Sequence, residues 1–371
     1  MTQYTCSITP DLLRGALDLE DTPNGVALHR LPSWARAQSS HLQLAIAETQ
    51  PSGVRVVFRT AATTIELDTV MTVRTYAGLP PSGDVLFDLI VDGNLVAQEP
   101  ATGGAAGTVR FSGLDDRIKD VEIWLPHDQT VDLKVLRSNA VIEPQPADDR
   151  PTWIHYGSSI SQGSGAASPS RTWPAIAASA LGLDLINLGF GGSALIEPFV
   201  ARTIRNAPGD VISLDIGINL VNTDVMRLQA LTPAVHGFLD TIREGHPSTP
   251  LVVISPLYCP IHEDTPGPTA LDPTALADGV LRFVATGDPS EQEAGKLTMN
   301  VIRDELSRVV KQRSATDQHI HYIDGRDLYG KDDFAQFPLS DELHPVADTH
   351  EQIGSRITEV TVWPHSIFAE K

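Results

Sequence analysis

The hydrophobic positions of the first 146 residues form short apolar runs, and many of them alternate with polar residues. Such a period of two is typical of β-strands that bury one face. Glycine, proline, aspartate and asparagine separate the runs, and Asp92-Gly93-Asn94 has the composition of a hairpin turn. We therefore expect an antiparallel, jelly-roll-like β-sandwich here. Its predicted strands are Val54–Arg59, Thr64–Val70, Val85–Val91, Gly107–Phe111, Asp120–Leu125 and Val131–Leu136.

The pattern changes after Glu143–Pro151, a segment whose prolines and charges suit an exposed linker. From there, short apolar runs alternate with longer segments of helical periodicity, which indicates an α/β fold with a parallel sheet flanked by helices. We predict strands at Thr152–Gly157, Asp184–Leu188, Asp210–Ile216, Leu251–Pro256 and His319–Ile323, with helices at Trp173–Leu181, Pro198–Asn206, Leu228–Gly245 and Glu291–Gln312. Two domains follow, at residues 1–146 and 147–371, and Cys259–Asp288 is long enough to form a lid or a binding loop.

Composition narrows the class of protein. The 371 residues carry a formal net charge of −20, and both predicted domains are acidic, which argues against nucleic acid and anionic membranes as partners. Only two cysteines occur, so a disulfide scaffold is excluded. The first residues show no basic or apolar signal region, and no apolar run approaches the ~20 residues of a membrane span. We expect a cytoplasmic location.

The ends of the predicted parallel strands carry the candidate chemistry, because function gathers at the carboxyl edge of such sheets. Ser159 follows the first strand, the segment Gly189–Ala194 the second and Asn219 the third, while Asp341 and His344 lie near the end of the chain. Taken singly, each is an ordinary turn or loop residue. Gly189–Ala194 also fits a Gly-x-Gly-x-x-Ala dinucleotide fingerprint, although that motif is expected on the first strand of such a unit.

The ordered set resembles the SGNH (GDSL-type) hydrolase superfamily. Gly157–Ile160 is similar to its first block, Gly192 to its second, Gly217–Asn219 to its third and Asp341–Pro345 to its last, over roughly residues 152–350. The arrangement with a preceding sandwich resembles two-domain carbohydrate esterases and related actinobacterial esterases and acyltransferases. The resemblance implies a five-stranded parallel sheet, which agrees with the strands read from the pattern.

The same resemblance implies residue roles. Ser159 would be the nucleophile, His344 the general base and Asp341 the carboxylate that orients the imidazole. The amides of Ser159 and Gly192 and the side chain of Asn219 would bind the oxyanion. No cofactor is implied.

The sequence departs from the family pattern at three positions. Ser158 and Ile160 stand where the Asp and Leu of Gly-Asp-Ser-Leu are usual, and Leu220 stands where an Asp often follows the third block. None of these three positions carries the reacting groups.

We expect a serine esterase that acts on a neutral small-molecule or sugar ester through an acyl-Ser159 intermediate. An acyltransferase that passes the acyl group to a hydroxyl acceptor would use the same residues, so it remains an alternative. A third possibility is a carbohydrate-binding protein with an inactive second domain, in which Trp34 and Trp124 stack on sugar rings.

Arg171, Trp173 and Tyr258 are candidates for the wall of a substrate pocket, because they lie near the first block and in the Pro-rich loop. We predict no metal site. His319 and His321 share one face of a strand, but the sequence offers them no nearby partners. The oligomeric state is left open.

Overall fold

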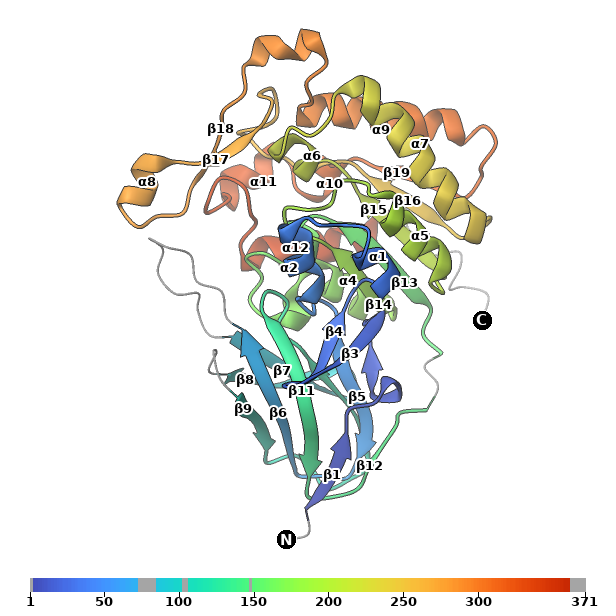
Figure 1. The fold of residues 1–371 in the computed structure, drawn as a ribbon, viewed down its shortest axis with the longest axis vertical. Coiled ribbons are helices and arrows are strands. Elements are labelled where there is room, and N and C mark those ends of the chain that lie inside the picture. Colours follow the sequence, from blue (N-terminus) through green and yellow to red (C-terminus); the bar gives the residue numbers. More distant parts are fainter. Residues whose placement is uncertain (1–2, 73–84, 102–105, 147–148, 361–371) are drawn as a thin grey trace.

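The computed structural model describes residues 3–72, 85–101, 106–146 and 149–360. A β-sandwich lies at one end of the molecule and an α/β layer at the other (Figure 1). Positions 147 and 148 of the predicted linker lie outside the described residues.

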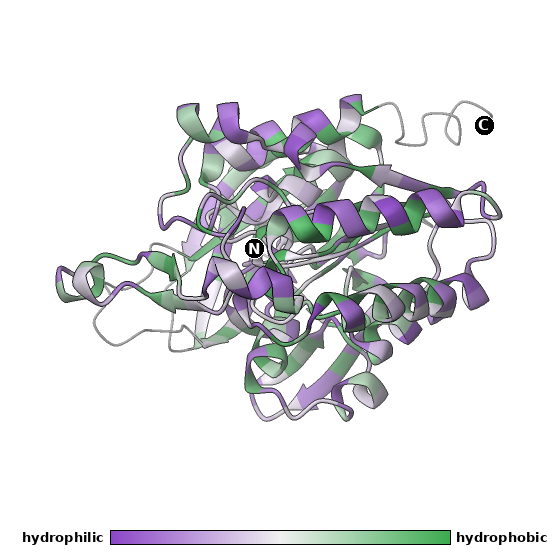
Figure 2. Cartoon of the chain, turned by 90° about the horizontal axis from the view of Figure 1, so that it is seen from above, coloured by the Kyte–Doolittle hydropathy of each residue, from purple (hydrophilic) through white to green (hydrophobic). Residues whose placement is uncertain are grey.

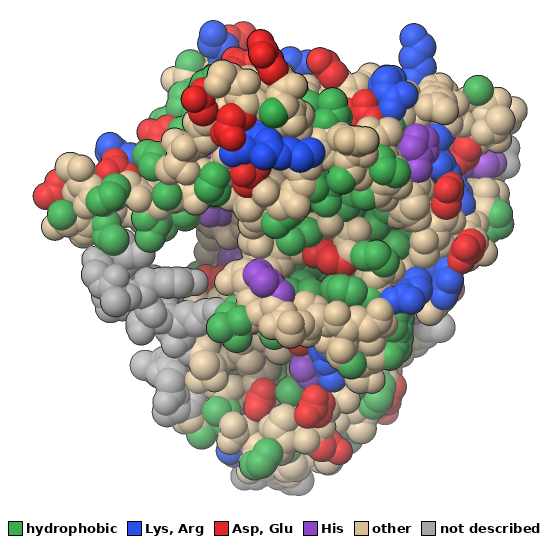
Figure 3. Space-filling model, turned by 45° about the horizontal axis from the view of Figure 1, so that its top comes forward, with side chains coloured by type: hydrophobic (Ala, Val, Ile, Leu, Met, Phe, Trp, Pro, Cys, Tyr) green, Lys and Arg blue, Asp and Glu red, His purple; other side chains and the backbone are tan. Residues whose placement is uncertain are grey.

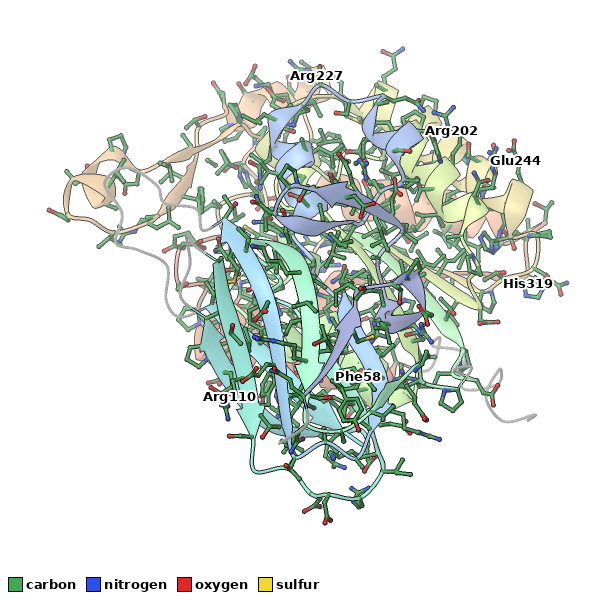
Figure 4. The ribbon with its side chains drawn as sticks, turned by 60° about the horizontal axis from the view of Figure 1, so that its bottom comes forward. Phe58, Arg110, Arg202, Arg227, Glu244 and His319 are labelled. Carbon is green, nitrogen blue, oxygen red and sulfur yellow. The ribbon has the colours of Figure 1, made fainter. Side chains whose placement is uncertain are left out.

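The sandwich consists of two antiparallel sheets. One has the order β3-β4-β11-β6-β9 with β1 beside β11, and the other has the order β12-β5-β10-β7-β8 with β2 beside β5. Its inward side chains form one core, in which Phe58 is completely buried (Figure 4). The strands are β1 (Tyr4–Ser7), β2 (Leu13–Arg14), β3 (Asp18–Thr22), β4 (Gly25–His29), β5 (Arg55–Thr60), β6 (Thr64–Thr72), β7 (Val85–Val91), β8 (Asn94–Ala101), β9 (Ala106–Ser112), β10 (Lys119–Trp124), β11 (Thr130–Ser138) and β12 (Ile142–Glu143).

Every strand predicted for this part is present. Alternation is clearest in β6, where every second residue is buried. Asp92 and Gly93 join β7 to β8 with φ angles of 48° and 80°, the left-handed conformation that a tight hairpin requires. The observed strands β1–β4, β8 and β12 match no predicted segment, and each of them is short or at most half-buried.

The α/β part is built on a five-stranded parallel sheet in the order β14-β13-β15-β16-β19. These strands are β13 (Thr152–Gly157), β14 (Asp184–Gly189), β15 (Val211–Asp215), β16 (Leu251–Ile254) and β19 (Ile320–Ile323). Its helices are α3 (Ser159–Gln162), α4 (Trp173–Leu181), α5 (Pro198–Asn206), α6 (Ile218–Asn222), α7 (Leu228–Gly245), α9 (Met299–Arg313), α10 (Gly325–Leu328), α11 (Lys331–Gln336) and α12 (Ala347–Glu359). The fold class and all five parallel strands predicted from the sequence are confirmed.

One helix was predicted too long. The segment Pro289–Ala294 forms a separate 3-10 turn, and α9 begins only at Met299. Gly295 adopts a φ of 82° and ends the turn, and the Thr298 side chain accepts a hydrogen bond from the Val301 amide and caps α9.

Two short helices, α1 (Ser33–Arg36) and α2 (Leu42–Thr49), leave the sandwich and pack on the α/β part (Figure 1). Leu31, Ala35, Leu44 and Ala47 belong to the same buried cluster as the parallel sheet. The boundary at residues 146/147 stays a prediction, but the two parts share a core.

The loop predicted at Cys259–Asp288 contains structure of its own. It carries β17 (Thr269–Leu271), α8 (Pro273–Ala277) and β18 (Phe283–Ala285), and we call residues 269–285 the arm. The arm projects from one side of the molecule in Figures 1 and 2.

Candidate active site

Ser159 is placed by a sharp turn from β13 into α3. The Ser158 side chain caps this helix by accepting a hydrogen bond from the Ile160 amide. A side chain at Gly157 would come within 2.2 Å of Ser161 Oγ, so only glycine lets α3 start this close to the strand. Ser159 therefore stands at the carboxyl edge of the sheet, on the first residue of a helix.

Ser159 is hydrogen bonded to His344, although 185 residues separate them in the chain. Ser159 Oγ lies 2.9 Å from His344 Nε2, and His344 Nδ1 lies 2.7 Å from Asp341 Oδ2. The other carboxylate oxygen of Asp341 accepts hydrogen bonds from the backbone amides of Leu343 and His344. This is the order of nucleophile, base and orienting carboxylate that activates a serine hydroxyl.

The electrostatics of Asp341 favour its charged form. Burial alone would raise its pKa, but the hydrogen bonds and charge of His344 and the two backbone amides outweigh burial and leave the pKa below its ordinary value. A carboxylate at this position holds Nδ1–H, which leaves Nε2 free to accept the serine proton.

The second and third strands bring donor groups to the same place. Asn219 donates from its side-chain amide to the Phe190 carbonyl at 3.2 Å, which places it beside the turn after β14. A Cβ atom at Gly191, within that turn, would lie 3.4 Å from Ser159 Cβ. Within the described residues, no protein acceptor is bonded to the amides of Ser159 or Gly192. These amides and Asn219 can therefore receive a developing oxyanion.

A buried chain of hydrogen bonds anchors α3 from below. Trp153 Nε1 donates to Ser213 Oγ, which lies 2.7 Å from His155 Nδ1. His155 Nε2 lies 2.8 Å from Ser161 Oγ, which donates to Asp215 Oδ2 at 3.2 Å.

Burial lowers the pKa of His155 to about 3. Burial raises the pKa of Asp215 to about 7, against the opposing hydrogen bond from Ser161. The imidazole is therefore neutral.

The buried carboxyl of Asp215 should make stability fall as pH rises. Between the ordinary Asp pKa and about 7, the folded state holds a proton that the unfolded state has released, so unfolding becomes easier by about 1.4 kcal/mol per pH unit from this group. We expect Asp215→Asn to match the wild type in melting temperature at pH 4 and to exceed it at pH 8. Calorimetry at both pH values checks this, and an equal difference at the two would contradict it.

Ser159 and His344 of the triad line an open cleft of about 610 Å³ between the sandwich, the α/β part and the arm, with Asp341 buried behind His344. None of the described lining residues is Lys or Arg. The Phe283 ring stands with its centroid 5.7 Å from that of His344, and the Phe283 amide donates to the Asp341 carbonyl at 2.9 Å. The lining consists of Gln43, Ile46, Gln50, Asp128, Gln129, Ser159, Gln162, Ser164, Gly191, Gly192, Asn219, Asn222, Thr269, Ala270, Leu271, Phe283, Leu343 and His344.

Three residues proposed from the sequence as pocket wall do not line this cleft. Trp173 is buried, with its ring 4.6 Å from that of His155. Arg171 lines a separate hollow between the sandwich and α4, and Tyr258 lines a small cavity behind Leu343. Nearness in the chain to the first block selected Arg171 and Trp173, but α4 turns away from the cleft.

The structure supplies other wall residues that sequence reasoning missed. Gln43, Ile46 and Gln50 come from α2 and the residue after it, and nothing in their local pattern connects them with Ser159. Phe283 lies in the loop that the sequence did single out as a lid or binding loop, so its length was the available signal.

A metal site and a dinucleotide-binding turn both find little support in the described part of the chain. No group of three or more His, Cys, Asp and Glu residues there could hold a metal ion, and His319 lies at the outer edge (Figure 4). Gly189–Ala194 leads into a turn and α5 starts only at Pro198, so no helix N-terminus follows as the dinucleotide motif requires.

Of the two candidate tryptophans, Trp34 is 39% exposed and Trp124 is buried. Arg202 lies 5.6 Å from the Trp34 ring centroid, and Arg55 lies 4.9 Å from that of the buried Trp124.

No helix in the described residues is long and apolar enough to cross a bilayer. Acidic and basic side chains are interspersed on the face shown in Figure 3.

Two family models match parts of this chain. The model of the GDSL-like lipase/acylhydrolase family matches residues 151–259, and the model of the SsfX3 N-terminal domain matches residues 12–134. The salicylyl-acyltransferase SsfX3 from a tetracycline biosynthetic pathway is 30% identical, with 98% of each chain covered and a TM-score of 0.83. The chain belongs to the GDSL-like lipase/acylhydrolase family. It is a serine hydrolase or an acyltransferase of the same mechanism.

Two more distant structures share the fold of this GDSL-like enzyme. A family two carbohydrate esterase from Clostridium thermocellum, in complex with cellohexaose, is 14% identical over 94% of this chain and 97% of that chain, with a TM-score of 0.60. An acetyl xylan esterase from Butyrivibrio proteoclasticus is 13% identical over 97% of each chain, with a TM-score of 0.55. No curated protein matches the sequence significantly.

Proposed function

We propose that this enzyme hydrolyses an uncharged ester through an acyl-Ser159 intermediate. The observation that carries the proposal is the continuous hydrogen-bonded chain Ser159–His344–Asp341 in an open cleft. His344 Nε2 takes the hydroxyl proton as Ser159 Oγ attacks the ester carbonyl, and Asp341 stabilises the imidazolium that forms.

Charge then develops on the carbonyl oxygen. The amides of Ser159 and Gly192 and the Asn219 side chain are the groups that we assign to its stabilisation. The tetrahedral intermediate breaks its bond to the alcohol, which leaves with the proton held by His344. Water, deprotonated by the same imidazole, releases the acid and restores Ser159.

The substrate that we favour is neutral. Asp128, on the sandwich side, is the one Asp, Glu, Lys or Arg residue in the described cleft lining, and the chain carries a net charge of −20. An anionic substrate would be repelled over this surface. Amides from Gln50, Gln129 and Asn222 suit the hydroxyl and carbonyl groups of a sugar or another small polar ester.

Acyl transfer to a hydroxyl acceptor is the second candidate. It is favoured by the similarity to the salicylyl-acyltransferase, which extends over both parts of the chain. A cleft of about 610 Å³ also has room for an acyl group together with an acceptor.

Partitioning of the acyl group tests the two candidates. With p-nitrophenyl acetate, we expect release of p-nitrophenol that disappears in Ser159→Ala, with acetate as the product found by mass spectrometry. If alcohols accelerate the release and an acetyl ester accumulates in place of acetate, transfer is the activity and hydrolysis is contradicted. Absence of any Ser159-dependent release contradicts both.

A further inference from the structure

The glycine turn beside Ser159 is held by side chains on both polar groups of Gly191. Gln43 Nε2, from α2, donates to the Gly191 carbonyl at 2.9 Å. The Gly191 amide donates to Gln162 Oε1 at 2.8 Å. Gln162 is itself fixed, since its amide donates to Gln50 Oε1 at 2.6 Å and to the His127 carbonyl at 3.1 Å. Three of these four partners come from the sandwich side of the molecule.

The turn lies between Ser159 and Gln43. A Cβ built on Gly191 would be 3.4 Å from Ser159 Cβ, whereas one built on Gly192 would be 3.2 Å from Gln43 Cγ. Gly191 therefore faces the nucleophile, and Gly192 faces α2.

The Gly191–Gly192 peptide bond links these two sides. In a trans peptide, the carbonyl of one residue and the N–H of the next point in opposite directions. The Gly191 carbonyl points at Gln43, so the Gly192 N–H points away from α2, toward the side of the turn on which Ser159 lies. Glycine rotates readily, and Gly192 already has a φ of 69°, so an unheld peptide here could turn over at small cost.

We propose that Gln43 is a positioning residue of the oxyanion site, which acts by holding the Gly191 carbonyl so that the Gly192 N–H stays aimed at the substrate oxygen. The inference rests on the function proposed above. It gives the N-terminal part a role in the rate of the reaction, since Gln43 comes from a helix that leaves the sandwich.

The neighbourhood agrees with a support of this kind. Arg30, completely buried, donates to the carbonyls of Asn187 and Gly189 at 3.0 and 2.6 Å and also to that of Ala47 in α2. Its guanidinium carbon lies 5.0 Å from the ring centroid of Phe190, which immediately precedes Gly191. Arg30 therefore connects the end of β14 to α2, beside the turn that contains Gly191.

Gln43→Met tests the proposal, because it keeps the length of the side chain and removes the donor. We expect kcat for p-nitrophenyl acetate to fall by about 10- to 100-fold, less than the ~10²–10³ for complete loss of one oxyanion donor, with little change in KM. Affinity for an alkyl boronic acid, which forms a tetrahedral adduct with the serine, should fall by the same factor. Gln43→Leu, which also lacks a donor and carries no charge, should behave alike and serves if the first variant does not fold.

Gln38→Met is the matched control. Gln38 lies between α1 and α2 and bonds to the Trp34 carbonyl and to Arg202, away from the turn, so its kcat and boronic acid affinity should equal those of the wild type. A purely structural role for Gln43 would raise KM or lower the melting temperature and leave kcat unchanged, which overturns the proposal. If the wild type hydrolyses the ester with Ser159 dependence and both Gln43 variants match it, only this inference fails. If the wild type itself shows no such turnover, the proposed function fails with it.

Discussion

Ser159→Ala should lower kcat by about 10⁶-fold, because the nucleophile that forms the acyl intermediate is lost while the fold is kept. Residual turnover would come only from binding and the oxyanion donors. The measurement is p-nitrophenol release at saturating substrate, together with mass spectrometry of the quenched protein. In the wild type an acyl adduct should appear on the peptide that contains Ser159, and in the variant that adduct should be absent.

A second serine provides the comparison. Ser314 ends α9 on the surface, where its hydroxyl donates to the Lys311 carbonyl at 2.9 Å, so Ser314→Ala should retain wild-type kcat. Ser159→Ala with more than a few per cent of wild-type kcat would mean that another group attacks the ester.

Asp341→Asn should lower kcat by about 10⁴-fold. The asparagine amide can donate to His344 Nδ1 and so favours the tautomer that carries its proton on Nε2, which cannot accept the proton of Ser159. The fold should tolerate the change, since Asn Oδ1 can still accept from the amides of Leu343 and His344. Steady-state kinetics and a thermal melt of the same preparation check this.

The pH dependence of stability gives the second readout for Asp341. Its folded pKa lies below the unfolded value, so the carboxylate stabilises the fold above the unfolded pKa, and this contribution is lost as pH falls through the folded pKa. The difference in melting temperature between wild type and Asp341→Asn should therefore shrink in acid. Asp240→Asn, at an exposed ion pair with Arg313, is the control and should keep full activity. An Asp341→Asn variant with undiminished kcat would remove Asp341 from the mechanism.

The parallel sheet and the gathering of candidate residues at one of its edges could be predicted from the sequence, for a physical reason. Ser159, Gly192 and Asn219 each follow a parallel strand, and the carboxyl ends of such strands meet at one edge whatever the intervening chain does. The helices Trp173–Leu181, Pro198–Asn206 and Leu228–Gly245 were also predicted with their observed bounds. An apolar face repeats clearly in the last two, whereas the first is apolar over nearly its whole length.

The walls of the cleft were not predictable in the same way. Gln43 and Gly191 are 148 residues apart, and their contact depends on how α2 packs on the α/β part rather than on any local pattern. The Pro-rich loop was singled out, but Tyr258 was chosen from it instead of Phe283, because the register that turns Phe283 toward His344 is set by the pairing of β17 with β18.

The buried guanidinium of Arg30 has a consequence for building chimaeras. Burial lowers its pKa to about 9, with Glu48 opposing the shift, so it is still a cation at neutral pH, enclosed by backbone carbonyls contributed by both parts of the chain. A cation in such a place is stable only while all of its acceptors are present. Exchanging the sandwich for that of a relative at the residue 146/147 junction would therefore replace Arg30 and Gln43 along with it. A working hybrid must carry residues 30–50 together with the α/β part, as if that stretch belonged to the catalytic domain.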